Sequence, residues 1–125
     1  MGKIGIVFCM LFFISCSGPS FTKDELIGTY VGNKRVGGDS IILLETSKYV
    51  HIGIRKCDNT RYADTGYWEL YDKGRTVIFD EFITHNLKDA SIDTVSGSWF
   101  AEIFFKKKKI CLNVSTDQAL YYIKQ

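Results

Sequence analysis

Residues 48–55 read Lys-Tyr-Val-His-Ile-Gly-Ile-Arg, and their side chains alternate in character from one position to the next. Successive side chains of a β-strand point to opposite faces, so Val50, Ile52 and Ile54 share one face. We expect this aliphatic face to be dry and His51, on the other face, to be a surface histidine. The stretch therefore predicts a β-strand with one buried face.

Similar runs recur along the chain, separated by clusters of Gly, Asn, Asp and Ser that favour turns. The predicted strands are residues 28–31, 39–45, 48–55, 65–71, 76–82, 97–105, 109–114 and 119–124. Thr22-Lys23-Asp24-Glu25 has the spacing of a capping box, which predicts one short helical turn before the first strand. Residues 84–92 fit either a helical turn or a wide loop.

Short strands that follow one another without long crossovers predict antiparallel pairing. Open edges in so small an all-β domain favour aggregation, so we expect the sheet to close or to fold on itself. The predicted fold is all-β: an eight-stranded antiparallel up-and-down barrel with a short N-terminal helical turn, whose interior is either filled by side chains or just wide enough for one small ligand.

The composition is that of one globular domain, with 125 residues of which 46% are hydrophobic. Sixteen Lys and Arg against fourteen Asp and Glu give a net charge of +2, which is too balanced for a nucleic-acid-binding protein. We therefore expect no nucleic-acid partner.

The N-terminus has the pattern of an export signal. Residues 4–14 form an uncharged apolar run after Lys3, too short to span a bilayer but of the length of a signal-peptide core. The run ends in Phe13-Ile14-Ser15-Cys16, which resembles the lipobox of bacterial lipoproteins. The resemblance implies that residues 1–15 are removed and that Cys16 carries the lipid anchor, palmitate included; the alternative is an ordinary secretory signal in which Cys16 is incidental.

By that resemblance the protein is anchored by lipid in the cell envelope. Ser17, directly after the anchor, is compatible with the outer membrane facing the periplasm, and the inner membrane is the alternative. Residues 16–21 would form a tether and residues 22–125 the folded domain. Cys57 and Cys111 remain in an oxidising compartment, where they are candidates for a disulfide. The alternative is that each is a small buried hydrophobic residue.

Three Gly-x-aromatic triplets begin predicted strands, and they place Tyr30, Trp68 and Trp99 where large rings would plug the barrel. Together with the closing segment Leu120-Tyr121-Tyr122-Ile123, this pattern is similar to the lipocalin-like domains of many bacterial lipoproteins. The resemblance implies a ligand cavity if the interior is not packed shut.

The sequence contains no motif of a nucleophile, a phosphate-binding loop or a metal site, so we expect no enzymatic activity, no metal and no cofactor. Asp80 and Glu81 are adjacent, and on a regular strand they would point to opposite faces. We interpret them as solvated strand positions rather than paired catalytic carboxylates.

Two surface features are candidates for binding. Four consecutive lysines, Lys106, Lys107, Lys108 and Lys109, predict an exposed hairpin tip, and they would also suit anionic lipid headgroups. Phe100 and Phe104 lie on the face of their strand opposite Trp99, which predicts an aromatic exterior that is either a partner surface or covered by a loop.

These features favour a lipid-anchored module that binds a small apolar ligand or serves as a scaffold. The second hypothesis is a protein-recognition or inhibitory lipoprotein of the immunity type, which binds an envelope partner through its aromatic exterior. An enzyme is the weakest of the three hypotheses, because no nucleophile lies beside a base in any recognised pattern.

Overall fold

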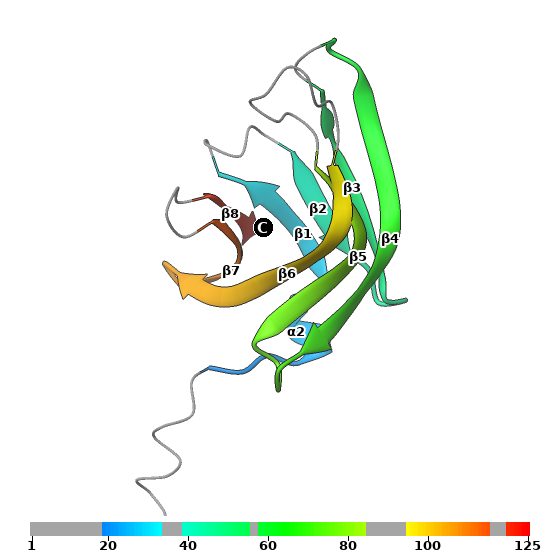
Figure 1. Cartoon of the computed structure of the whole chain (residues 1–125). Helices are drawn as coiled ribbons and strands as arrows, with labels where there is room; N and C mark the ends of the chain where they lie inside the picture. Colours follow the sequence, from blue (N-terminus) through cyan, green and yellow to red (C-terminus); the bar gives the residue numbers. More distant parts are fainter. Residues whose placement is uncertain (1–18, 34–38, 56–57, 85–94, 116–119) are drawn as a thin grey trace, which may run out of the picture.

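The computed structural model describes residues 19–33, 39–55, 58–84, 95–115 and 120–125. These described residues form one short helix and eight strands, arranged as Figure 1 shows. The elements are α2 (Lys23–Leu26), β1 (Gly28–Gly32), β2 (Ser40–Leu43), β3 (Lys48–Ile54), β4 (Arg61–Tyr71), β5 (Thr76–Thr84), β6 (Val95–Lys106), β7 (Lys109–Ser115) and β8 (Leu120–Lys124). The predicted signal peptide, the lipobox-like motif, Cys57 and residues 85–92 of the uncertain stretch lie outside the described residues.

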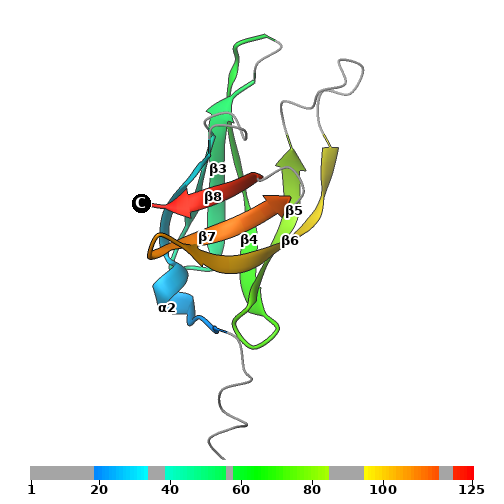
Figure 2. The ribbon, with the colours of Figure 1, turned by 90° about the vertical axis from the view of Figure 1, so that its left-hand side faces the viewer.

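The strands form a closed antiparallel barrel in sequence order, which confirms the predicted fold. Each strand pairs with the next, and β1 pairs with β8, where Tyr30 lies opposite Lys124 and Gly32 opposite Tyr122. Figure 2 shows β7 and β8 crossing in front of β3 and β4. The barrel therefore has no free edge between its first and last strands.

The helical turn closes one end of the barrel. Thr22 is its N-cap and forms the predicted capping box with Glu25, and Leu26 at the end of the turn is fully buried. The hydroxyl of Tyr30 donates a hydrogen bond of 2.7 Å to the carbonyl oxygen of Leu26. Because this carbonyl ends the helix, Tyr30 satisfies an acceptor that has no partner within the helix itself.

The three predicted plug aromatics take different positions. Tyr30 and Trp68 are buried, and the Trp68 indole donates to the carbonyl oxygen of Leu44 at 3.1 Å. Trp99 is only half-buried, and its ring stacks on Phe79 with centroids 4.8 Å apart. Two of the three are therefore closed into the core.

The predicted orientation of β3 was wrong. Tyr49 and His51 point inward and are each 1% exposed, whereas Ile52 and Ile54 lie on the outer face and are 38% and 53% exposed. The physical reason is that both inward side chains have hydrogen-bond partners. The Tyr49 hydroxyl donates to the backbone carbonyl oxygen of Asp80, and the His51 ring lies against the Asp39 carboxylate. Local alternation does not contain this information.

A β-bulge in β5 corrects a second expectation. Phe79 pairs with Trp99 and Phe82 pairs with Gly97, so β5 has one residue more than β6 between these pairs. Glu81 has a φ of 49° at this point, so the strand is not regular here, and both Asp80 and Glu81 are exposed, which confirms them as solvated positions. The bulge lets both phenylalanines point into the core, although they are three positions apart.

Candidate functional site

A buried polar cluster lies inside the barrel at the end away from α2, and it joins β3, β4 and β8 to the residue that precedes β2. Oδ2 of Asp39 lies 2.5 Å from Nε2 of His51, accepts a hydrogen bond of 2.6 Å from the Tyr122 hydroxyl and lies 3.4 Å from the Tyr62 hydroxyl. Asp39 is 7% exposed and His51 1%. We call Asp39, His51, Tyr62 and Tyr122 the Asp39 cluster.

The two tyrosines act as proton donors in this cluster. Burial raises the pKa of the Tyr122 hydroxyl strongly, and the nearby Asp39 carboxylate raises it further. The pKa of Tyr62 is raised for the same two reasons, burial first. Both hydroxyls therefore stay protonated over the physiological pH range.

One oxygen of the cluster has no hydrogen-bond partner in the part of the chain that the structure describes. Asp39 Oδ1 is buried and accepts no hydrogen bond from any described residue. The His51 ring stacks on Phe82 with centroids 4.5 Å apart, and it meets the Tyr62 ring edge-on at 5.2 Å. The cluster thus lies against aromatic rings of the core. Among the described residues, no group of three or more His, Cys, Asp or Glu side chains is arranged to hold a metal ion.

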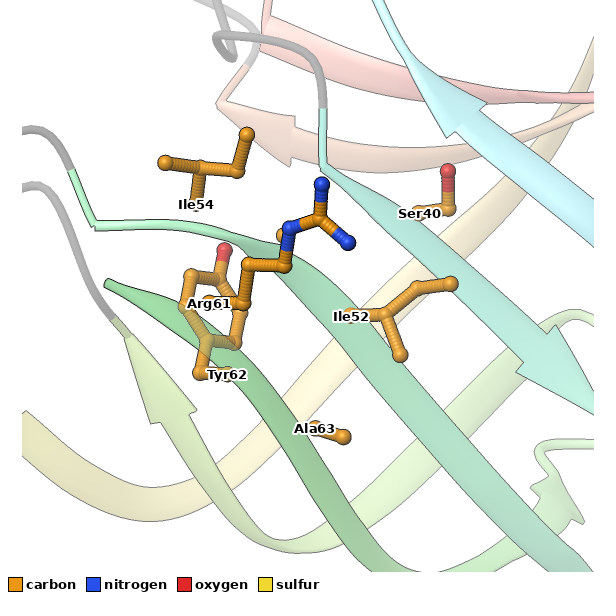
Figure 3. Close-up of a pocket in the computed structure, with 7 residues that line it drawn as sticks. Ser40, Ile52, Ile54, Arg61, Tyr62 and Ala63 are labelled. Carbon is orange, nitrogen blue, oxygen red and sulfur yellow. The ribbon is translucent and has the colours of Figure 1, made fainter. Parts of the chain in front are cut away.

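A groove lies on the outer face of β2, β3 and β4, next to this cluster (Figure 3). Its volume is about 430 Å³, and its lining is Ser40, Ile52, Gly53, Ile54, Arg61, Tyr62 and Ala63. The exposed Ile52 and Ile54 make it largely apolar, and Figure 3 shows the Arg61 guanidinium among their side chains. Within the described part of the chain, no carboxylate forms an ion pair with Arg61.

Gly53 connects the groove to the Asp39 cluster. A Cβ atom at this position would lie 2.8 Å from Cβ of Asp39 and would collide with the Tyr62 ring. The backbone of β3 therefore passes directly over these two side chains, and no larger residue fits there. This groove was not predicted from the sequence, because the fourth strand was expected to begin at Thr65 and Ile52 and Ile54 were expected in the core. The glycine inside an apolar strand was the available signal.

The predicted exposure of Phe100 is confirmed: its side chain is 63% exposed, and it lies opposite Ile78 on β5. Tyr67 and Tyr71 on the outer face of β4 are 60% and 61% exposed. We call Tyr67, Tyr71, Ile78 and Phe100 the outer aromatic face. A hollow of about 330 Å³ opens beside Tyr67 and Ile78.

Phe104 does not join this face. It is half-buried, and its ring packs edge-on against Tyr121 with centroids 5.7 Å apart. Phe105 alternates with Phe104 and so falls by its position on the Trp99 face of the strand, but it is 54% exposed. It lies beside the turn at the end of β6, where its ring contacts Phe21 at 5.0 Å instead of filling the barrel.

The four lysines form the predicted exposed hairpin tip between β6 and β7. Lys106 pairs with Lys109, and Lys107 and Lys108 form the turn. The Lys106 ammonium donates to the Tyr121 hydroxyl at 2.8 Å and lies over its ring.

The cysteine predictions remain open. Cys111 is buried, and it lies opposite Phe104 on one side and Ile123 on the other. Its thiol is free among the described residues, and burial raises its pKa. The candidate partner Cys57 lies outside the described residues, as does Cys16, so the disulfide and the lipidation both stay predictions.

No protein-family model matches the chain, and comparisons with curated proteins and with solved structures find no match either. No helix of the described residues is long and apolar enough to cross a bilayer.

Proposed function

We propose that the protein is a lipid-anchored cell-envelope lipoprotein that acts as a small-ligand-binding module. Residues 1–15 are the signal peptide, and acylated Cys16 holds the barrel on the outer membrane, facing the periplasm. The support for the anchor is the lipobox-like Phe13-Ile14-Ser15-Cys16 directly after an apolar run. Two or more acyl chains anchor a protein firmly, since each buried CH₂ contributes ~0.8 kcal/mol.

The observation that carries the binding proposal is the groove on β2, β3 and β4. Its volume of about 430 Å³ lies within the usual range of small-molecule sites, roughly 300–1,000 Å³. Ile52, Ile54 and Ala63 offer apolar contact, and Arg61 offers a guanidinium without an ion-pair partner among the described residues. A small apolar molecule with an acidic head, such as a medium-chain fatty acid, fits this combination.

The test is titration of the purified protein with dodecanoate, followed by calorimetry and native mass spectrometry. Ile52→Ser combined with Ile54→Ser removes the apolar lining, and we expect at least a tenfold weaker affinity, equivalent to about 1.4 kcal/mol. Val114→Ser is the matched control, because Val114 is 40% exposed on β7, away from the groove. Equal affinity of the double variant and the control would refute the groove as the site.

Arg61→Gln tests the contribution of the ligand's acidic head to the affinity separately from that of its apolar hydrocarbon chain. This variant should weaken dodecanoate binding and leave dodecanol binding unchanged, because only the carboxylate interacts with the guanidinium. Loss of both ligands would instead show that Arg61 acts by packing.

The anchor is tested independently by growing cells with radiolabelled palmitate. The protein should incorporate the label, and a Cys16→Ser variant should not incorporate it and should leave the membrane fraction. A variant that fractionates like the parent would refute the anchor without affecting the groove.

A second candidate function is protein recognition of an inhibitory or immunity type, and the outer aromatic face favours it. Exposed aromatic side chains grouped on one surface are typical of partner interfaces. Phe100→Ser should abolish binding to such a partner while leaving the fold intact, since this ring is mostly in solvent. Unchanged binding to an identified partner would place the interface elsewhere.

A further inference from the structure

The turn between β6 and β7 combines exposed charge with an exposed ring. Phe105 is 54% exposed, and Lys107, Lys108 and Lys109, which follow Phe105 and Lys106 in the sequence, are exposed as well. We call these four residues the basic corner. Across the described ranges, no carboxylate forms an ion pair with any of the three lysines. Since Lys106 is held against Tyr121, the positive charge available to a partner is that of the other three.

The backbone of the corner is unfavourable for lysine. Lys107 and Lys108 have φ angles of 51° and 66°, in the left-handed region. Two-residue hairpin turns of this kind favour Asn-Gly, and each non-glycine residue in this region costs roughly 1–2 kcal/mol. The chain thus keeps two lysines where a better turn sequence exists. Strain of this kind is concentrated at functional positions.

The corner lies at the end of the barrel where the tether enters. The Phe105 ring contacts the Phe21 ring at 5.0 Å, and the Phe21 amide donates to the Gly74 carbonyl oxygen at 2.8 Å. Figure 2 shows the β6–β7 turn next to α2. Cys16 precedes Phe21 by five residues, so even a fully extended tether spans only about 17 Å.

We propose that the basic corner is a docking surface for an anionic phospholipid bilayer. This inference rests on the proposed anchoring at Cys16, which confines the corner to the neighbourhood of the membrane. The lysine ammonium groups contact the lipid phosphates, each contributing about 1 kcal/mol near an anionic surface. The Phe105 ring enters the interface beside them, and the two contacts together fix the tilt of the barrel, whereas the anchor alone leaves it free to swing.

The test is lysine footprinting of the acylated protein in vesicles of phosphatidylcholine alone and of phosphatidylcholine with phosphatidylglycerol. An amine-reactive reagent reports the accessibility of each lysine by mass spectrometry. Labelling of Lys107, Lys108 and Lys109 should fall about fivefold when phosphatidylglycerol is present, the ratio that corresponds to ~1 kcal/mol. The exposed Lys48 on β3 is the internal control, and its labelling should not change. High salt should restore labelling of the corner.

A turn variant excludes unfolding as the cause. Lys107→Asn with Lys108→Gly supplies the preferred turn residues, so it should be at least as stable as the parent. It should nevertheless lose the protection of Lys109, because two of the three charges are gone. Phe105→Ser should weaken the protection while keeping every charge.

The outcomes distinguish this inference from the proposal on which it rests. Protein that fails to stay on either kind of vesicle would overturn the anchor. Protein that stays on both, with equal labelling of the corner in both, would overturn the docking surface and leave the anchor standing. If the equal labelling is low in both kinds of vesicle, the corner is shielded by its closeness to the membrane alone, and the contact with anionic headgroups is still overturned.

Discussion

Tyr122 donates a hydrogen bond of 2.6 Å to the carboxylate of Asp39, across 83 positions of the sequence. Asp39 immediately precedes β2, and Tyr122 lies in the middle of β8. The bond therefore crosses the interior of the barrel between strands that are not neighbours in the sheet. It joins the closing strand to the polar cluster that also holds His51.

Removal of this hydroxyl should destabilise the barrel. Tyr122→Phe leaves a buried carboxylate with one donor fewer, and we expect a loss of about 1.5–3 kcal/mol in the free energy of unfolding. Urea denaturation measures it. Tyr121→Phe on the same strand is the control, since its hydroxyl contacts Lys106 at the surface, and it should leave the urea midpoint essentially unchanged. Equal midpoints for the two variants would show that the Asp39 cluster does not stabilise the fold.

Gly66 is required by the ring that packs on it. A Cβ at Gly66 would lie 2.6 Å from Cε1 of Tyr49, whose hydroxyl continues to the Asp80 carbonyl oxygen at 2.8 Å. Gly66→Ala should therefore cost about 1–3 kcal/mol through overpacking. Gly97→Ala is the matched control, because nothing lies within 4 Å of its added Cβ. Thermal unfolding of both variants checks the difference, and a melting temperature for Gly66→Ala at or above that of Gly97→Ala would contradict it.

The fold was predictable because its signals are local. The capping box at Thr22 and the turn residues between strands act over a few positions, and the period-two pattern requires only that one face of each strand be buried. Pairing in sequence order then follows from the short connections. The closure of β1 on β8 is the one long-range pairing that this reasoning needed.

The site depended on contacts that local patterns do not contain. His51 is buried because Asp39 and the ring of Phe82 receive it, and neither lies on its own strand. The inward turn of His51 moves Ile52 and Ile54 to the outside, where they line the groove. The bulge at Glu81 likewise depends on how many residues β6 provides opposite it. Strand orientation was therefore decided by side-chain partners from other strands.

Alkaline pH should destabilise the protein partly through Tyr49. Burial, and after it the carboxylates of Asp64, Asp80 and Glu81, raises the pKa of Tyr49 to about 12. In the unfolded chain its pKa is about 10, so the unfolded state loses the proton first as the pH rises. The stabilising contribution of neutral Tyr49 is complete below pH ~10 and is lost as the pH rises toward the folded value.

The measurement is urea denaturation of the parent and Tyr49→Phe at a series of pH values from neutral into the alkaline range. Tyr49→Phe should cost about 1 kcal/mol at neutral pH, because the bond to Asp80 is gone. Its stability should then fall less steeply with rising pH than that of the parent. Tyr30, Tyr62 and Tyr122, whose pKa values burial also raises, account for the remaining fall. Parallel curves for the two proteins would contradict the role given to Tyr49.

Phe100 and Phe104 should differ in their contribution to stability, although the sequence pattern treats them alike. Phe100 is 63% exposed, whereas Phe104 is half-buried against Tyr121 and lies opposite the buried Cys111. Phe100→Ser should change the free energy of unfolding by less than ~0.5 kcal/mol, as surface substitutions usually do. Phe104→Ser should cost about 1–2 kcal/mol through lost apolar burial and ring contact. Chemical denaturation of the two variants checks this, and a larger loss for Phe100 would mean that the outer aromatic face is covered by another part of the chain and is not open to a partner.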